Sequence, residues 1–368
     1  MCARFSDLAE AQFHVPGFRN GPCGRYAGGM TMTLKPFRIG EIEIGFPVVL
    51  AALAGYSDLA YRRICRRLGA EYCATEMMLD RMHIQPGRQV RLMSRSEQAD
   101  HPVAGQIVGN KPEEMAGATK TLDDLGFDVI DLNFACPVRK ALGRQRGGFL
   151  MSQPENAIAI TRAVCSATDR PVTLKLRQKF ATADNEDAFF RIAEGAFDAG
   201  AAAICAHARS VEQKYAGPAD WDFLARVKAH FGEKTILGSG DVLTPGMALE
   251  MLQQTGVDAA AVARGCLGNP WFFRQVRDLA EGRLPYHPSL AEQRAVMLEH
   301  LEGAVELYGQ SRGPKHMRKF GIKYARLHPG PKQVRMAFVA VRKPEDWHDV
   351  LRRFYGEKEE FAAEAVGK

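Results

Sequence analysis

The chain has 368 residues, 46% of them hydrophobic and 25% charged, and a formal net charge of +6. This composition is ordinary for a globular enzyme, and the length suits a large barrel with an appendage better than one typical domain. No apolar run approaches the ~20 residues that a membrane span needs, so we expect no membrane association. None of the eight cysteines forms a C-x-x-C pair, which predicts reduced thiols in a cytoplasmic protein without a bound metal.

The first 30 residues show no periodicity and are rich in glycine and turn residues. They also lack the apolar core of a signal peptide. We therefore expect residues 1–30 to be a disordered extension or an unused upstream start.

Short apolar runs alternate with amphipathic stretches over residues 31–285. Each of the eight runs is followed by a plausible helix, although the second interval, which includes Gln85 to Met93, is poorly defined. This alternation predicts an α/β fold, a (β/α)₈ TIM barrel. An open doubly wound sheet is the rival, but no dinucleotide or P-loop glycine motif follows any run. The runs are Val48–Leu53, Tyr72–Thr75, Val103–Ile107, Val129–Asn133, Val172–Leu176, Ala203–Ala206, Thr235–Gly238 and Ala259–Ala263.

The pattern becomes purely helical near the C-terminus. Residues 286–357 are predicted to form a small all-helical domain, and residues 358–368 a charged tail. Ten lysines and arginines and no acidic residue lie between Ser311 and Lys343, whereas the rest of the chain has 39 basic and 43 acidic residues. This segment is either a solvated charged face or a site for a polyanion.

Polar residues follow six consecutive strands of the predicted barrel, where functional residues of this fold gather. Any one of them would be unremarkable, but six in succession predict one ring-shaped site. They are Gln106, Asn133, Lys175, His207 with Arg209, Ser239-Gly240-Asp241, and Ala263-Arg264-Gly265.

These residue types suit a flavin. Glycines after the last two strands allow backbone N–H groups to approach a phosphate, and Arg264 adds positive charge there. Gln106 has both donors and acceptors, as the pyrimidine edge of the flavin ring requires. Lys175 offers a positive charge for an anionic reduced flavin, although an ion pair at the barrel mouth would also explain a lysine there.

Cys136 lies on a loop directly after the fourth strand, in the segment Asn133-Phe134-Ala135-Cys136-Pro137. A lone cysteine is more often a small buried hydrophobe than a catalyst. Here its place at the active face and the nearby Arg139, Arg144 and Arg146 predict an exposed, reactive thiol.

These segments resemble the tRNA-dihydrouridine synthase family, from about Leu34 to about Tyr355. The chain departs from the family pattern after the first strand, where Ala51-Ala52-Leu53-Ala54-Gly55 replaces Ala-Pro-Met-Ala-Gly. It also has Ser239 and Ala263 where the family usually has Asn and Gly. The other matching segments are Arg146-Gly147-Gly148-Phe149-Leu150-Met151, Lys175-Leu176-Arg177, His207-Ala208-Arg209 and Gly268-Asn269-Pro270-Trp271.

The resemblance implies an oxidoreductase that reduces the C5–C6 bond of specific uridines in tRNA, with FMN as cofactor and NADPH as transient reductant. It implies that Cys136 is the general acid and that Asn133, Lys140 and Arg209 contact the substrate. Because the target base lies within folded RNA, it must swing out to be reached. The implied FMN contacts are Ala52, Leu53, Ala54, Gln106, Lys175, His207, Ser239, Gly240, Asp241, Ala263 and Arg264.

The basic segment supplies the expected RNA contacts of the helical domain. Lys315, Lys319 and Lys323 recur at i, i+4 and i+8, which places them on one helix face. We expect this face to bind tRNA through its backbone, although the lysines would also suit a helix that packs on the barrel. Phe320 is expected in the core rather than as a stacking platform. We expect a monomer.

Two other functions remain open. An FMN barrel oxidoreductase acting on a small molecule, similar to dihydroorotate dehydrogenase, would use a strand-end cysteine as a base, but it leaves the basic segment without a purpose. A non-catalytic tRNA-binding protein with a decayed barrel would bind no flavin.

Overall fold

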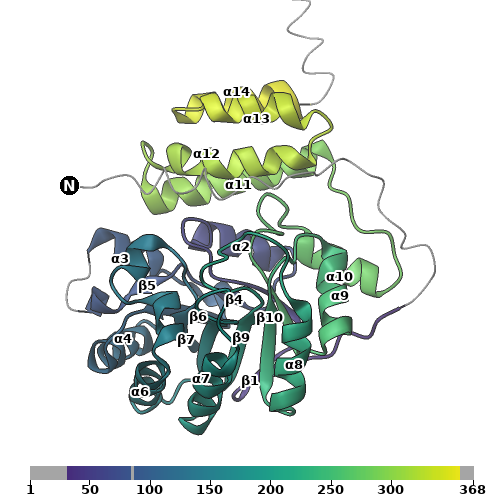
Figure 1. Ribbon diagram of the computed structural model, residues 1–368. Coiled ribbons are helices and arrows are strands. Elements are labelled where there is room, and N and C mark those ends of the chain that lie inside the picture. Colours follow the sequence, from purple (N-terminus) through teal and green to yellow (C-terminus); the bar gives the residue numbers. More distant parts are fainter. Residues whose placement is uncertain (1–30, 84–86, 357–368) are drawn as a thin grey trace, which may run out of the picture.

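Eight parallel strands form a closed barrel in the computed structural model, which describes residues 31–83 and 87–356 (Figure 1). The strands pair in the order β4-β3-β11-β10-β9-β8-β7-β6, and pairing of β4 with β6 closes the ring. The TIM-barrel prediction is thereby confirmed, while the predictions for residues 1–30 and 358–368 lie outside the described residues. The strands are β3 (Val48–Leu50), β4 (Cys73–Ala74), β6 (Val103–Val108), β7 (Val129–Phe134), β8 (Val172–Arg177), β9 (Ala203–His207), β10 (Thr235–Ser239) and β11 (Ala259–Val262), and the short β5 (Met78–Leu79) extends the pairing of β6.

Both faces of these strands are buried. Every residue of β6 and β7 is buried, because the inward side chains fill the barrel and the outward ones pack under helices. This arrangement explains why the strands read in the sequence as continuous apolar runs rather than as alternating patterns.

The outer helices begin at identifiable caps. The Asp58, Asp220 and Thr244 side chains accept a backbone N–H in the first turns of α2, α8 and α9, and α4, α6 and α9 have proline in the first turn, as helix starts favour. The second interval contains only short elements, among them α3 (Arg88–Met93). The barrel helices are α2 (Leu59–Arg67), α4 (Pro112–Asp124), α6 (Pro154–Cys165), α7 (Asp187–Asp198), α8 (Trp221–Phe231), α9 (Pro245–Thr255) and α10 (Phe272–Ala280).

An antiparallel hairpin precedes the barrel and was not predicted. It consists of β1 (Phe37–Ile39) and β2 (Ile42–Ile44), and its apolar side chains are buried in one cluster with interior residues of the barrel strands. The Thr235 hydroxyl at the start of β10 donates to the Arg38 carbonyl at 2.8 Å. The hairpin therefore covers the amino-terminal end of the barrel, opposite the carboxyl ends of the strands.

Four helices form a separate layer over the barrel (Figure 1). The first begins with a capping box between Ser289 and Glu292 and packs against α2. Phe320, expected in the core, is fully buried. Among the described residues, no helix is both long and apolar enough to cross a membrane. The layer consists of α11 (Leu290–Tyr308), α12 (Gly313–Tyr324), α13 (Pro331–Ala340) and α14 (Pro344–Tyr355).

Candidate functional site

A cavity with an empty volume of about 1020 Å³, including solvent at its mouth, opens at the carboxyl ends of the strands. Its wall contains Cys136, Asn133 and every predicted FMN contact, and these residues come from the ends of seven different strands. The sequence thus grouped residues that the fold brings together. The lining residues from the sequence prediction are Ala52, Leu53, Ala54, Gln106, Asn133, Cys136, Lys175, His207, Ser239, Gly240, Asp241, Ala263 and Arg264.

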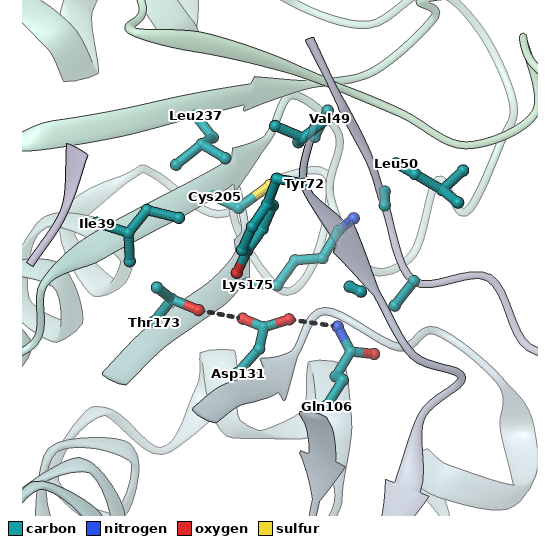
Figure 2. Close-up of a pocket in the computed structure, with 14 residues that line it drawn as sticks. Ile39, Val49, Leu50, Tyr72, Gln106, Asp131, Thr173, Lys175, Cys205 and Leu237 are labelled. Atoms are coloured by element: carbon teal, nitrogen blue, oxygen red, sulfur yellow. Dashed lines mark hydrogen bonds between the residues drawn. The ribbon is translucent and has the colours of Figure 1, made fainter. Parts of the chain in front are cut away.

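A chain of hydrogen bonds runs from the barrel interior to this cavity (Figure 2). The Thr173 hydroxyl donates to one oxygen of Asp131 at 2.8 Å, and the Gln106 amide nitrogen donates to the other at 2.6 Å. The Asn133 amide nitrogen then donates to the Gln106 side-chain oxygen at 2.7 Å. Because Asp131 accepts and Asn133 donates, only one orientation of the Gln106 amide satisfies both partners.

The same chain holds the loop that carries the cysteine. The Asn133 side-chain oxygen accepts the backbone N–H groups of Ala135 at 3.1 Å and Cys136 at 2.9 Å. The Gly148 N–H donates to the Cys136 carbonyl at 3.0 Å. A Cβ at Gly147, whose φ is +61°, would lie 2.8 Å from the Cys136 Cβ, so a side chain is excluded there. The position of Cys136 is therefore fixed from two sides.

The protonation of Cys136 differs from the prediction. Burial raises the pKa of this partly buried thiol above its ordinary value, and the lowering effects of the Val138 backbone and Arg177 are smaller. The expected reactive thiol, exposed among basic neighbours, is therefore wrong, and Arg146 instead pairs with the buried Asp80 at 2.9 Å. Cys136 is held as a neutral thiol at neutral pH.

Lys175 extends from β8 into the barrel interior and lines both the main cavity and a smaller one beneath it (Figure 2). Among the described residues it forms neither a hydrogen bond nor an ion pair, so no barrel-mouth ion pair explains it there. Burial raises the pKa of the buried Asp131, and the charge of Lys175 offsets part of that rise. The ammonium group is therefore available to an anion in the cavity.

His207 presents a buried polar atom with no protein partner. Its Nδ1 lies 3.1 Å from the Ser239 hydroxyl, while Nε2 has no hydrogen-bond partner among the described residues. Burial, followed by the charges of Arg177 and Lys175, lowers the pKa of His207 well below its usual value, so the ring is neutral. A buried nitrogen without a partner is costly, which indicates that a ligand in the cavity completes it.

The end of β10 and the loop after β11 form one side of the cavity. Gly240 and Asp241 have φ of +131° and +54°, so the backbone turns sharply at the end of β10. One Asp241 oxygen lies 3.3 Å from an Arg264 nitrogen. The described lining residues include three cations, Lys175, Arg177 and Arg264, but Asp241 is the only carboxylate among them. This excess of positive charge suits a phosphate.

Arg177 and Tyr215 also line the cavity and were missing from the predicted site. The Arg177 guanidinium donates to the carbonyls of Ala135 and Ser210, each at 2.8 Å, and so ties the cysteine loop to the loop after β9. The Arg264 guanidinium lies 4.7 Å from the Tyr215 ring centroid. Arg177 follows Lys175 by two residues, so strand alternation could have placed both on the inner face. Tyr215 lies in a loop without a periodic signal.

The structure does not bring Arg209 to the cavity. Its guanidinium is 2% exposed and donates to the Gly217 carbonyl at 2.6 Å and to Asp241 at 2.5 Å. These bonds draw Arg209 behind the wall, where it orients Asp241. Lys140 does not line the cavity either: it lies exposed on the short helix α5 (Arg139–Leu142), close in sequence to Cys136. Substrate contact by these two residues stays a prediction.

The three lysines of α12 differ in environment. Lys315 is exposed, but the Lys319 ammonium donates to the Gly55 carbonyl of the barrel, and Lys323 is half-buried beside Gly268. Lys319 therefore points toward the barrel and does not share the exposure of Lys315. The cause is Phe320, which anchors the helix by packing on Tyr56 and Tyr61.

The residues present fit a flavin. The cavity offers an orphaned His207 nitrogen, an unpaired Lys175 and an oriented Gln106 amide. Gly240 and Arg264 lie after the last two strands, the usual phosphate position in this fold. The described residues contain no group of three or more His, Cys, Asp or Glu placed to hold a metal ion.

Comparison of the fold with solved structures gives a dehydrogenase and a reductase. Histamine dehydrogenase from Rhizobium sp. 4-9 superposes with a TM-score of 0.54 at 14% identity over 73% of this chain, which spans about half of that longer protein. Morphinone reductase in complex with tetrahydroNAD gives a TM-score of 0.51 at 15% identity, covering 70% of this chain and 93% of the other. At these identities the likeness concerns the fold alone.

Comparison of the sequence is more specific. The family model described as dihydrouridine synthase matches residues 49–359. A tRNA-dihydrouridine synthase B of Xanthomonas campestris is 35% identical over 86% of this chain and 95% of its own length. A probable tRNA-dihydrouridine synthase of Rickettsia conorii is 33% identical over 86% and 96%. The chain therefore belongs to the dihydrouridine synthase family of flavin-dependent oxidoreductases.

Proposed function

We propose that this protein reduces the C5–C6 bond of uridines in tRNA, with FMN as its cofactor and NADPH as the reductant. The single observation that carries the proposal is the position of Cys136: a neutral thiol in the wall of the cavity at the strand ends, held by Asn133 and facing the same space as Lys175. Relatives named for this activity support it.

FMN, once reduced by NADPH, supplies the hydride that uracil accepts at C6. When FMN is bound, the oriented Gln106 amide would suit its pyrimidine edge, Lys175 would offset negative charge on its ring, and the loops of Gly240 and Arg264 would hold its phosphate. The His207 nitrogen without a protein partner donates or accepts one further hydrogen bond.

Cys136 supplies the proton. Its thiol S–H bond breaks as a C–H bond forms at C5, so that hydride at C6 and proton at C5 together saturate the double bond. Burial keeps the proton on sulfur until the substrate arrives. The same burial argues against a dihydroorotate dehydrogenase-like reaction, in which the cysteine would have to act as a base.

RNA is held outside the cavity. We propose that residues 286–357 are the tRNA-binding domain and that the exposed Lys140 and Lys315 contact phosphates. The target base leaves its stack to enter the cavity. We expect a cytoplasmic monomer.

Replacing Cys136 with alanine tests the proposal. The Cys136→Ala protein should bind FMN and accept electrons from NADPH at nearly the parent rate, because the thiol is not among the groups that hold the phosphate or the pyrimidine edge. Reduction of tRNA in a single turnover should slow by about 10²–10⁴-fold, the usual contribution of a general acid. If the variant reduces tRNA at the parent rate, Cys136 is structural and the mechanism is wrong.

A further inference from the structure

Two loops of the cavity wall lie next to each other and under the helical layer. The loop after β3 contributes Ala52, Leu53 and Ala54 to the wall, and the loop after β11 contributes Ala263 and Arg264. Their strands are paired neighbours in the barrel. The two loops therefore leave the barrel side by side, where α12 and the turn after it pass over them.

The first loop is held at Gly55. Its carbonyl accepts a hydrogen bond from the Lys319 ammonium of α12, and its N–H donates to a Glu76 oxygen at 2.9 Å. Gly55 has a φ of +80°, a conformation that side chains rarely tolerate. Both polar backbone groups of this residue are thus bound by side chains from outside the loop, one residue beyond the cavity-lining Ala54.

The end of the same loop is held at Asp58. One carboxylate oxygen caps α2 by accepting the Tyr61 N–H at 3.0 Å. The other oxygen accepts a hydrogen bond from the Tyr308 hydroxyl at 2.9 Å and lies 2.9 Å from the His316 Nε2. Both of these partners belong to the helical layer. Burial raises the pKa of Asp58, but the hydrogen bond and charge of His316 outweigh it, so the group stays ionised. Helices α11 and α12 therefore supply the partners of a buried carboxylate in the barrel.

The second loop is held by the turn after α12. An Arg326 nitrogen donates to the Gly265 carbonyl at 2.6 Å, one residue beyond Arg264. At Gly268, φ is +70° and a Cβ would lie 2.2 Å from the Lys323 carbonyl carbon, so the two backbones are in direct contact. The loop that carries Arg264 is thus packed against α12.

The charges at the first contact compensate each other. Burial raises the pKa of Glu76 to about 7 and lowers the pKa of Lys319, and each shift is partly offset by the other residue's charge. Removing one charge would leave the other buried beside the loop, which is costly. A lysine that only solvated its helix would have no such partners.

We propose that Lys319 and Arg326 are positioning residues of the cofactor site: from the helical layer they fix the two loops at the β3–β11 seam in the shape that binds FMN. This inference rests on the proposed FMN site. It assigns to the helical layer a task separate from RNA binding, because both side chains donate to backbone carbonyls of the barrel loops.

The test compares FMN affinity among single substitutions in the full-length protein. Lys319→Met and Arg326→Met keep an apolar stem but remove the hydrogen-bond donor. Each should raise the dissociation constant for FMN by about tenfold, as loss of one charged hydrogen bond typically does. Arg318→Met is the matched control, since Arg318 lies on the same helix and forms no hydrogen bond or ion pair among the described residues. Its affinity should stay within about twofold of the parent. Quenching of free-flavin fluorescence on binding measures all four proteins.

The rise in melting temperature on adding saturating FMN gives a second readout that does not depend on absolute stability. A smaller rise in Lys319→Met and Arg326→Met than in Arg318→Met supports the inference, even if the variants melt lower without cofactor. Parent-like affinity and an equal rise would overturn it, as would loss of tRNA binding alone. A parent protein that binds no FMN would instead refute the proposed cofactor, and this outcome is visible before any variant is made.

Discussion

Asp131 accepts a hydrogen bond from the Gln106 side-chain nitrogen at 2.6 Å, and this contact decides which end of that amide faces each neighbour. Asp131 is buried beneath the cavity and does not line its main chamber. Its hydrogen bonds reach the cofactor site through Gln106, Asn133 and the loop that carries Cys136.

We therefore predict that Asp131→Leu weakens FMN binding although the residue is remote from the cofactor. Without its acceptor the Gln106 amide is free to rotate, and the expected loss is about 1 kcal/mol, or about fivefold in the dissociation constant. Thr173→Val is the control, because it removes a partner of Asp131 but leaves the Gln106 contact in place. Equal affinities in Asp131→Leu and the parent would show that Gln106 orientation does not matter.

The raised pKa of Cys136 predicts that its thiol is alkylated slowly at neutral pH. The nucleophile in alkylation is the thiolate, so at pH 7.5 the protein without substrate should react with iodoacetamide more slowly at Cys136 than a free cysteine does. The rate should rise with pH through and above the ordinary value of 9.0. For the same reason, single-turnover uridine reduction should stay flat through pH 8 and fall only as the thiol loses its proton. Peptide mass spectrometry measures the alkylation, and rapid labelling at pH 7 would contradict a protonated acid.

Lys175 is predicted to act on the flavin rather than on the fold. Lys175→Met retains the aliphatic stem and removes the only charge of β8 that lines both cavities. We expect weaker FMN binding or slower reduction by NADPH, with a melting temperature of the FMN-free protein within a few degrees of the parent, because no protein ion pair is lost. The flavin absorbance band after reconstitution and stopped-flow bleaching of that band report the two effects. If FMN binding and the rate of its reduction both equal those of the parent protein, Lys175 is not part of the cofactor site.

RNA affinity should depend on the exposed cations of the helical layer. Lys315, Lys332 and Arg335 are exposed, and changing all three to glutamate should raise the dissociation constant for tRNA and reduce its salt dependence by about one unit of slope per lost phosphate contact. FMN affinity should not change, in contrast to Lys319→Met. Unaltered tRNA binding at every salt concentration would place the RNA surface elsewhere.

The strands could be predicted because burial on both faces makes each one a continuous apolar run, and all eight runs are strands of the barrel. The hairpin of Phe37–Ile39 and Ile42–Ile44 escaped because three residues are too few to show a period. Strand ends located the cavity wall, since the topology of a closed parallel barrel fixes where they meet. Helical spacing, by contrast, shows which residues share a helix face but not whether that face packs on the barrel or faces solvent. The contact of Lys319 with Gly55 therefore could not be predicted from the sequence.

The contacts between the barrel and the helical layer also determine at which residues two such proteins can be joined into a chimera. A chimera joined near residue 285, between the barrel and α11, would pair the Asp58 and Gly55 of one parent with the His316 and Lys319 of another. A mismatch there would leave the Asp58 carboxylate buried without its partners, close in sequence to the cavity-lining Ala54. A crossover in the Leu327–Gly330 segment keeps α11, α12 and Arg326 with their own barrel and exchanges only α13 and α14. Transplants of the outer two helices should therefore tolerate sequence divergence that transplants of all four do not.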